Sequence, residues 1–469
     1  MDPLALILSR VQFGFTASFH IIFPAFTIGL AAWLAVLEGL HLFTGKPVYA
    51  RLFRFWMKIF AVAFGMGVVS GIVMAFEFGT NWSVLSELTG PIQGPLLAYE
   101  SFTAFALEAT FFGIMLFGRG RVPAWVYFGS CCMVALGTTL SAFWILVNNS
   151  WMQWPEGYEI VGGLYHPTDW WAILTSDVVW ARFPHMLLAA FLTTAFSVAA
   201  TGAWYLLRHR HLAEGRVMIR MGLGLAAVLV PTQIFYGHLV GEVVHQYQPA
   251  KFAAIEGRWE TEQPASEILI AIPDPEAETN HLEVSVPYLG SLIATGTWDS
   301  RELGIKAFPV DERPPVIVPF FTFRVMVGCG LLMLAIAWIG VFLHFRRRLD
   351  GSRPFLWATF LSFPLSFVAT LAGWFTAEIG RQPWAVYGQL RTADAVTPTL
   401  SGFDVALTLT AFGLVYLLIF LSGSLYIYRL LQEGPEPEDR HDDRIGNPKR
   451  PLAVAGATSD APLPHLTGE

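Results

Sequence analysis

Residues 9–40 read SRVQFGFTASFHIIFPAFTIGLAAWLAVLEGL. This stretch decides the fold, because it is longer than the roughly 20 apolar residues that an α-helix needs to cross a bilayer. It lacks a basic leading region and a small-residue cleavage site, so we expect a retained membrane span and not a cleaved signal. His20 lies inside it, about 18 Å from its start at 1.5 Å per residue. An ionisable group at that depth is costly and usually functional.

Stretches of this kind recur along the whole chain. Of the 469 residues, 54% are hydrophobic and only 14% are charged, whereas a soluble domain carries roughly 25% charged residues. Nine stretches have the length and composition of membrane spans: 9–40, 52–78, 94–117, 122–147, 178–207, 217–244, 319–345, 355–378 and 403–428. The sequence therefore predicts an all-α, polytopic membrane protein with about nine transmembrane helices. No basic stripe suggests a nucleic-acid partner, and the net charge of −7 adds little to this.

Lysine and arginine set the expected orientation. They gather in alternate loops and in the C-terminal tail, whereas the opposite loops 79–93 and 148–177 contain none. By the positive-inside rule the N-terminus is expected outside and the C-terminus in the cytoplasm. Four regions follow: transmembrane helices 1–6 (1–248), an outside loop (249–318), helices 7–9 (319–432) and a disordered, Pro- and Asp-rich cytoplasmic tail (433–469).

Four potential iron ligands are predicted at similar depths near the outer face. His185 lies about two turns into the fifth span, Met326 two turns into the seventh, and Glu378 closes the eighth, while His20 belongs to the first. Histidine, methionine and carboxylate are the residue types that hold haem iron. Each has a plainer interpretation: interhelical hydrogen bonding for the histidines, core packing for Met326, and an interfacial ion pair with Arg381 for Glu378.

Neighbouring residues bear on that choice. Arg324 lies two residues before Met326, and a guanidinium inside a span needs an anion such as a haem propionate. His238 and His245, late in the sixth span, are the main competing ligands. The three cysteines all fall in spans and form no CxxCH motif, so any haem is expected to bind without thioether links.

Two acids on the third span suggest a proton path. Glu108 follows Glu100 by eight residues, about 12 Å along a helix, and a rotation of about 80° puts them on related faces. Buried carboxyl groups have raised pKa values, which suits proton transfer. With Ser141 on the next span they form a candidate relay. A pair of structural, hydrogen-bonding acids is an equal alternative on the residues alone.

Several longer blocks carry a family resemblance. They are GWFTAEIGRQPW (373–384), RVMVG (324–328), EFGTNW (77–82), WILVNNSWMQ (144–153) and, in the outside loop, KFAAIE (251–256). Over nearly its whole length the chain resembles subunit I of the cytochrome bd-type quinol oxidases. The resemblance implies an all-α protein of the bacterial inner membrane. It oxidises quinol at the outer face and reduces O2 to water with protons from the cytoplasm.

The resemblance implies a role for each candidate residue. His185 and Met326 would ligate a low-spin haem b, which has no free position and only relays electrons. His20 and Glu378 would each hold one of two high-spin haems, either haem b with haem d or b-type haems alone, with no copper. The remaining implied roles are quinol handling by Lys251 and Glu256, proton delivery by Glu100 and Glu108, and contacts to the haems by Arg324, Trp374 and Arg381.

The resemblance also implies partners. These are ubiquinol or menaquinol, O2, the lipid bilayer and a second membrane subunit (subunit II), with a small single-helix subunit as a further candidate. Because only about 70 residues separate the sixth and seventh spans, the chain resembles the short-loop branch, which includes cyanide-insensitive oxidases. Some members of that branch contain only b haems.

Three other classes are weighed against this one. A haem–copper oxidase needs clustered copper-binding histidines, and no span carries two well-buried histidines. A dihaem cytochrome b needs histidine pairs about four turns apart on two helices, and none exists. In a transporter, His20, Glu100 and Glu378 would be proton or cation sites. An absorption spectrum separates a haem protein from a colourless transporter.

Overall fold

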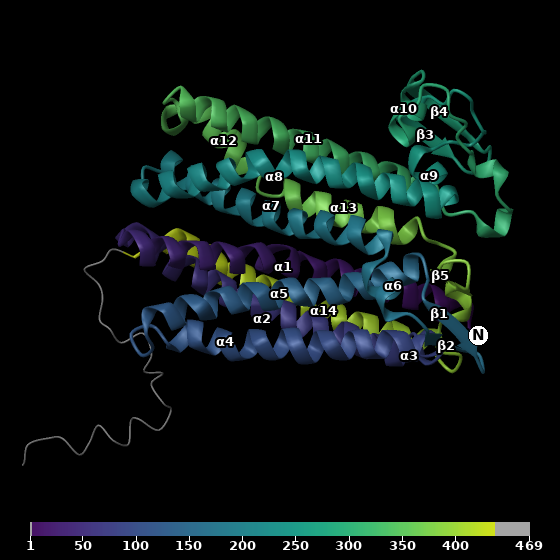
Figure 1. Ribbon diagram of the computed structural model, residues 1–469, viewed down its shortest axis with the longest axis horizontal. Coiled ribbons are helices and arrows are strands. Elements are labelled where there is room, and N and C mark those ends of the chain that lie inside the picture. Colours follow the sequence, from purple (N-terminus) through teal and green to yellow (C-terminus); the bar gives the residue numbers. More distant parts are fainter. Residues whose placement is uncertain (1, 437–469) are drawn as a thin grey trace, which may run out of the picture.

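The computed structural model describes residues 2–436 of the chain, leaving aside the side chains of residues 103–105. Within that range nine helices are long and apolar enough to cross a membrane. This confirms the predicted all-α membrane architecture. The helices run along the long axis of the molecule (Figure 1). The tail predicted at 433–469 lies outside the described residues from 437 onward.

The nine spans are built from these elements: α1 (Pro3–Thr44), α2 (Pro47–Thr80), α3 (Ser83–Tyr99) continued by the π-helical η1 (Glu100–Ala104) and α4 (Phe105–Phe117), α5 (Ala124–Gln153), α7 (Asp177–Leu207), α8 (Leu212–Tyr247), α11 (Ile317–Phe345), α12 (Arg353–Leu361) with α13 (Leu365–Ile379), and α14 (Gly402–Glu433). The connecting elements are β1 (Tyr158–Val161), β2 (Leu164–Pro167), α6 (Trp170–Thr175), α9 (Pro249–Glu256), β3 (Glu267–Asp274), β4 (Thr279–Val286), α10 (Leu289–Thr295), β5 (Trp384–Val386), β6 (Leu390–Arg391) and four short 3-10 turns.

Helix α1 is longer than its apolar composition alone indicates. The Asp2 side chain caps its start by accepting a hydrogen bond from the Leu4 amide at 3.0 Å, and Gly45 ends it with φ +66°. Its 42 residues span about 63 Å, roughly twice the hydrocarbon thickness of a bilayer. His20 therefore lies about 26 Å from the first helical residue, nearer the middle of its helix than the predicted span placed it.

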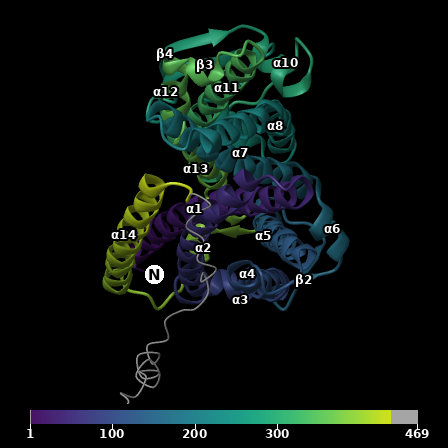
Figure 2. The same cartoon turned by 90° about the vertical axis from the view of Figure 1, so that its left-hand side faces the viewer.

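The helices form two groups. Helices α7, α8, α11, α12 and α13 lie together, and α1 to α5 with α14 form the second group (Figure 2). Helix α1 packs against α2, α5, α14 and also α7, so α1 and α7 join the groups. The three β-hairpins, α6, α9 and α10 all lie at one end, which is also the end of residue 2 (Figure 1). This end is the one that the basic-residue pattern predicts to face outside.

Two spans are interrupted, and the sequence-based boundaries missed both interruptions. The third contains the π-helical turn Glu100–Ala104, a feature often found at functional sites. The eighth breaks between Leu361 and Leu365, where Pro364 has no backbone N–H to donate. A continuous apolar run hides such breaks, because hydropathy does not register the loss of a backbone donor.

The outside loop is ordered. Its hairpin β3–β4 and helix α9 enclose a small apolar cluster that contains Ala254, Trp259 and Ile268 and continues onto Phe320 of α11. Long loops without secondary structure are uncommon in compact proteins unless they are functional or disordered. Here the loop packs onto the end of a span, which fixes α9 above the helix ends.

Candidate functional site

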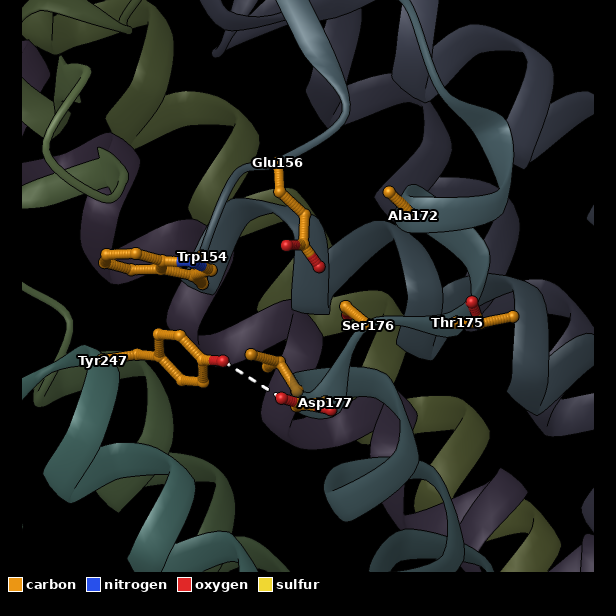
Figure 3. A pocket seen from close by; sticks show the side chains of 8 residues that line it. Trp154, Glu156, Ala172, Thr175, Ser176, Asp177 and Tyr247 are labelled. Carbon is orange, nitrogen blue, oxygen red and sulfur yellow. Dashed lines mark hydrogen bonds between the residues drawn. The ribbon is translucent and has the colours of Figure 1, made fainter.

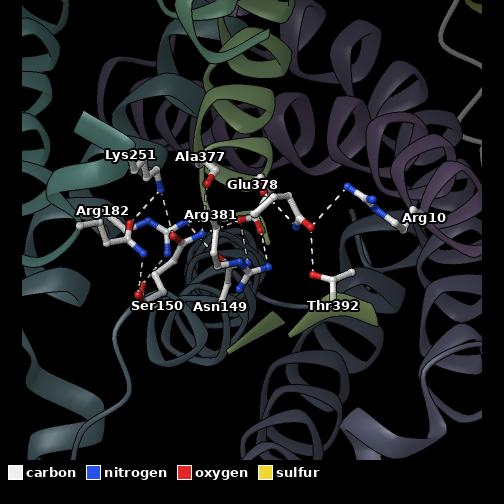
Figure 4. A network of polar contacts seen from close by, with 12 residues as sticks. Arg10, Asn149, Ser150, Arg182, Lys251, Ala377, Glu378, Arg381 and Thr392 are labelled. Carbon is white, nitrogen blue, oxygen red and sulfur yellow. Dashed lines mark hydrogen bonds and ion pairs between the residues drawn. The ribbon is translucent and has the colours of Figure 1, made fainter. Parts of the chain in front are cut away.

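Glu378, at the outer end of α13, is the centre of a buried polar network (Figure 4). Its carboxylate accepts hydrogen bonds from Arg381 Nη2 at 2.6 Å, Asn149 Nδ2 at 3.0 Å and Gln153 Nε2 at 3.1 Å. Arg182 Nη2 lies 3.8 Å away, completing a cluster of two cations around one anion. The ion pair with Arg381 that the sequence left open is therefore present.

Lys251 joins this network from the outside loop. Its Nζ donates to Gln153 Oε1 and to Gln248 Oε1, both at 3.0 Å. Burial, together with the positive charge of Arg182, lowers the pKa of Lys251 to about 7. Gln153 thus contacts Lys251 with its oxygen and Glu378 with its nitrogen, so the predicted quinol residue and a predicted iron ligand share one amide.

His185 and Met326 lie on α7 and α11, in the same helix group as Glu378, and each packs against a glycine. His185 Cε1 faces Gly237 of α8, where a Cβ would come within 3.3 Å, and Met326 Sδ faces Gly373 of α13, where a Cβ would come within 2.8 Å. His185 Nε2 lies 3.3 Å from Gln233 Nε2, while His185 Nδ1 is buried without a partner among the described residues. Helices α7, α8, α11 and α13 pack on one another, so both side chains belong to the same region.

His20 is held in one orientation by α2. Its Nδ1 lies 3.0 Å from Ser70 Oγ, and that hydroxyl donates to the backbone carbonyls of Met66 and Gly67. Because the hydroxyl proton is used there, Ser70 accepts from His20, and the imidazole carries its proton on Nδ1. The lone pair is then on Nε2, the atom available to a metal. Gly71 packs against the ring, with a Cβ position 3.0 Å from Cε1.

The two acids of the third span are separated by the π-helical turn. Ser141 Oγ donates to Glu100 Oε1 at 2.8 Å, so the structure brings this pair together as expected. Glu108 is 7% exposed and lies in the first turn of α4. The rotation of about 80° expected for a regular α-helix does not apply across a π turn, so the angle between the two acids differs from the sequence-based value.

Arg324 hydrogen-bonds to backbone carbonyls, and the carboxylates of Glu256 and Glu267 lie near enough to interact with its charge. Its guanidinium donates to the carbonyl oxygens of Leu269 at 3.0 Å, Ile255 at 2.9 Å and Phe320 at 3.0 Å, and also to that of Ile268. It stacks 3.5 Å from the centroid of the Phe320 ring. These bonds tie α11 to α9 and β3, so Arg324 fixes the outside loop on the helix that carries Met326.

Glu256 ends α9 beside a second acid that the sequence did not single out. Glu256 is 5% exposed, and its Oε2 has no hydrogen-bond partner among the described residues. Burial and the adjacent Glu256 carboxyl raise the pKa of Glu267, which hydrogen-bonds to it from β3. Two carboxyl groups this close hold one proton between them more easily than two charges.

A cavity of about 220 Å³ opens near the Glu378 network. It lies between the end of α5, helix α6 and the end of α8. Tyr247 donates a hydrogen bond to Asp177 Oδ2 at 3.1 Å across it (Figure 3). Trp154, the residue after Gln153, lines the same cavity. Its volume is below the roughly 300–1,000 Å³ of small-molecule sites.

Comparison with known proteins decides the family. The sequence model described as "Cytochrome bd terminal oxidase subunit I" matches residues 8–435. The chain belongs to this family.

Two curated relatives and one solved structure agree. The cytochrome bd ubiquinol oxidase subunit 1 of Bacillus subtilis (strain 168) is 35% identical over 454 residues, covering 93% of this chain and 96% of that protein. The cytochrome bd-II ubiquinol oxidase subunit 1 of Escherichia coli (strain K12) is 32% identical over 498 residues, covering 91% and 96%. The bd oxidase from Geobacillus thermodenitrificans superposes with a TM-score of 0.86 at 27% identity, covering 93% of this chain and all of that one.

Four predictions are confirmed by family membership and the nine spans. The resemblance to cytochrome bd subunit I is correct, and the chain is an all-α, multi-pass protein of the bacterial inner membrane. It is a quinol:O2 oxidoreductase subunit, and the family implies haem cofactors.

The candidate residues of this cytochrome bd subunit fit a flat, anionic prosthetic group. His20, His185 and Met326 each lie against a glycine, where any Cβ would crowd them. Nε and Nη1 of Arg381 are buried without a hydrogen-bond partner among the described residues, and an anionic group would satisfy such buried guanidinium donors. Trp374 precedes Glu378 by one helical turn on α13, so it lies on the same face.

Three polar residues that belong to the family-like sequence blocks had no predicted role. Asn149 and Gln153 belong to the block 144–153, and Glu77 to the block 77–82. Glu77 is 1% exposed and accepts a hydrogen bond from Thr16 Oγ1 at 2.9 Å. The sequence feature that could have identified each of them is a polar side chain near the end of an apolar span. For Arg182 the feature is stronger, because a charged residue lies three positions before the candidate ligand His185.

Proposed function

We propose that this subunit oxidises ubiquinol or menaquinol at the outer face and reduces O2 to water with protons taken from the cytoplasm. His185 and Met326 would hold a low-spin haem b, which would supply electron relay. His20 and Glu378 would each hold one of two high-spin haems, haem b with haem d or b-type haems alone, without copper. The convergence of Lys251 and Glu378 on Gln153 carries the proposal, because it joins the quinol loop to the oxygen site.

The ligand assignments rest on packing and on proton positions. His185 has a buried, partnerless Nδ1, and its Gln233 partner is an amide that can turn to suit the imidazole. His20 presents Nε2 because Ser70 keeps its proton on Nδ1. A bound haem would supply one-electron redox chemistry and, at a high-spin site, the iron for O2 reduction.

Glu378 is held as a carboxylate by its surroundings. Arg381 and Arg182 place positive charge on it, and Asn149 and Gln153 donate to it. One of its oxygens would supply the ligand to a high-spin haem. Arg381 then remains as a partner for an acidic group of the cofactor, through the donors that are unpaired here.

Quinol chemistry is assigned to the outside loop. With its pKa lowered to about 7, Lys251 is partly neutral near physiological pH and Nζ can accept a proton. Glu256 offers an unpartnered Oε2 to a quinol hydroxyl. Arg324, bonded to carbonyls of this loop, keeps both residues positioned over α11.

Proton supply is assigned to the third span. Glu108 lies deeper than Glu100 when measured from the outer end, and Ser141 hydrogen-bonds Glu100 from α5. A proton entering from the cytoplasm must cross the inner half of the bilayer, where a bare charge is costly. Glu108 therefore receives it first and Glu100 delivers it. A second membrane subunit, subunit II, with a small single-helix subunit as a further candidate, completes the proposed enzyme.

The test is a reduced-minus-oxidised spectrum of purified protein, combined with pyridine haemochrome analysis and quinol-driven O2 consumption. We expect one low-spin and two high-spin haem signals and turnover with quinol. A colourless protein would leave the transporter alternative, with His20, Glu100 and Glu378 as cation or proton sites.

A further inference from the structure

Six arginines gather at the end of the molecule opposite residue 2, where α8, α11 and α12 lie together (Figure 2). They stand in the early turns of α8, in the segment after α11 and at the start of α12: Arg216, Arg220, Arg346, Arg347, Arg348 and Arg353. The stretches 216–220 and 346–353 that hold them contain one carboxylate, Asp350. This end, which the basic-residue pattern predicts to face the cytoplasm, therefore carries a concentrated excess of positive charge.

Asp350 joins α8 to the turn that follows α11. Its Oδ2 accepts a hydrogen bond from Arg220 Nη2 at 2.8 Å and lies 3.1 Å from Arg216 Nε. Both arginine side chains remain about half exposed, at 46% and 50%. One carboxylate cannot neutralise two guanidinium groups, so positive charge is left over even here. The turn thus brings the arginines of α8 to those that follow α11.

The other four arginines are exposed, and none makes a hydrogen bond or ion pair within residues 2–436: Arg346, Arg347, Arg348 and Arg353. The Arg346 guanidinium lies 5.5 Å from the centroid of the Phe342 ring. That contact uses the face of the guanidinium and leaves its N–H groups for an anion. Neighbouring like charges repel one another, so a ligand that brings negative charge stabilises the whole cluster.

Arg347 occupies a backbone position that favours glycine. It follows the end of α11 with φ +55°, while its amide donates to the His344 carbonyl and the Arg348 amide to the Leu343 carbonyl. Helices that end in this way usually place glycine at the left-handed residue. A side chain there costs conformational energy, and strain of this kind points to a functional use of the residue. The charge of Arg347 is that use.

An apolar face continues from the arginines toward the membrane core. Helix α11 exposes Trp338, Phe342 and Phe345, which are spaced four and three residues apart and therefore share one side of the helix. Trp338 Nε1 donates to the Ala227 carbonyl of α8 at 3.1 Å, which fixes this side beside α8. Helix α12 adds the exposed Trp357. Tryptophan is enriched where a span meets the membrane–water interface. From Trp338 to Arg346 the helix rises by about 12 Å, so cations and apolar rings lie at adjacent depths.

We propose that the predicted cytoplasmic ends of α8, α11 and α12 bind an anionic phospholipid. Its phosphate contacts Arg346, Arg347 and Arg353, and its acyl chains lie along the exposed rings of α11. Guanidinium forks bind phosphate oxygens in pairs, and basic pockets between spans on the cytoplasmic side suit anionic head groups. A soluble anion would use only the arginines and leave the apolar face uncovered. The bound lipid links three helices of the group that also carries His185, Met326 and Glu378.

The test uses the haem-loaded enzyme in nanodiscs of phosphatidylcholine, with or without phosphatidylglycerol. A ligand that binds the folded state raises its melting temperature, so the wild type should melt several degrees higher with phosphatidylglycerol and retain that lipid in native mass spectrometry. Arg346→Gln with Arg353→Gln should lose the gain and retain several-fold less lipid. Arg346→Lys with Arg353→Lys keeps the charges that orient the loop but not the forks, and should retain an intermediate amount.

Arg347→Gly separates charge from backbone strain. Glycine relieves the left-handed conformation, so this variant should melt at or above the wild type in phosphatidylcholine and gain less from phosphatidylglycerol. Lys46→Gln with Arg429→Gln is the matched control, because it removes two exposed cations from the same end of the other helix group. It should keep the full gain. Dithionite-reduced spectra should be unchanged in every variant, which confirms that each has folded with its haems.

Three results would overturn the inference. Equal loss of the gain in the control would assign it to surface charge at large. A fall in melting temperature of the double glutamine variant that is the same in both lipids would mean that the arginines bind protein, such as the acidic segment 436–443 of this chain or a partner subunit. Full stabilisation by inorganic phosphate in phosphatidylcholine alone would make the site a plain anion site.

Discussion

Lys251 and Glu378 are bridged by a single amide. Gln153 accepts a hydrogen bond from Lys251 Nζ at 3.0 Å and donates one to Glu378 Oε1 at 3.1 Å. The lysine comes from the outside loop and the carboxylate from the end of α13, so the bridge connects the two proposed reaction sites. A change in the charge of Lys251 therefore alters the electrostatic environment of Glu378, with only the Gln153 side chain between them. Because Gln153 is only 2% exposed, bulk solvent screens that effect little.

The first prediction concerns the charge of Lys251. Its pKa is lowered from an ordinary value near 10.5 to about 7, so between those values the unfolded chain binds a proton that the folded chain does not. The free energy of unfolding should therefore rise with pH across this window. Lys251→Met should flatten that rise and slow quinol oxidation roughly ten-fold or more, with dithionite-reduced spectra near normal.

Thermal unfolding of the solubilised enzyme at several pH values, together with quinol-driven O2 uptake, measures both effects. Lys306→Met is the control, because Lys306 lies in the same loop and pairs with Glu260 at 2.7 Å in a more exposed position. Unaltered quinol turnover in Lys251→Met would make the lysine structural. The same quinol assay applies to Glu256→Ala.

The second prediction concerns the methionine ligand. Met326→Leu keeps the volume and apolarity of the side chain but removes the thioether that faces Gly373. We expect the low-spin haem to become high-spin or to fall in potential, while the other two haem signals persist. Met333→Leu, two turns further along α11 and buried in an apolar cluster, is the matched control. An unchanged low-spin band in Met326→Leu would assign Met326 to packing.

The membrane architecture followed from the sequence because a bilayer imposes length and apolarity on every span. The helix interruptions could not be predicted from hydropathy, because Pro364 and the π turn at Glu100 change backbone hydrogen bonds without changing the apolar composition. The order of the outside loop also escaped prediction. It depends on contacts such as Arg324 with Leu269, which no local pattern encodes.

The candidate site also contains residues that the sequence could predict and residues that it could not. The residue types at His20, His185 and Met326 were visible as polar or ligand-forming groups in apolar spans. The partners that orient them were not: Ser70 is 50 positions from His20, and Asn149 is 229 positions from Glu378. Glu267 lay in a loop with several other acids, and only the fold of β3 onto α9 distinguishes it.

The third prediction concerns the tautomer of His20. Ser70→Ala removes the acceptor of the Nδ1 proton, so the imidazole loses its fixed orientation while the ligand atom remains. We expect a shifted or broadened signal of one high-spin haem and slower O2 reduction. His20→Ala should remove or loosen that haem and abolish O2 consumption, with the low-spin haem still reducible. His41→Ala, at the other end of α1, should change neither. Normal turnover in His20→Ala would exclude the ligand role.

The last prediction concerns the proton path. O2 reduction consumes protons at a site near the outer face, and turnover moves protons across the membrane only if they come from the cytoplasm. Glu108 is 7% exposed and lies farther than Glu100, to which Ser141 is hydrogen-bonded, from the end of the molecule that is predicted to face outside. Glu108→Leu and Glu108→Gln should both leave reduction by quinol intact but slow reoxidation by O2, because neither side chain can carry a proton.

Glutamine retains hydrogen bonding, so a defect in both variants separates proton transfer from structural support. Time-resolved reoxidation of the reduced enzyme measures the step directly, and Glu87→Gln, an exposed position on α3, serves as the control for a lost carboxylate. A defect in Glu108→Leu alone would indicate that Glu108 supports the π-helical turn through hydrogen bonds. Wild-type kinetics in both variants would mean that the protons take a path that does not include the third span.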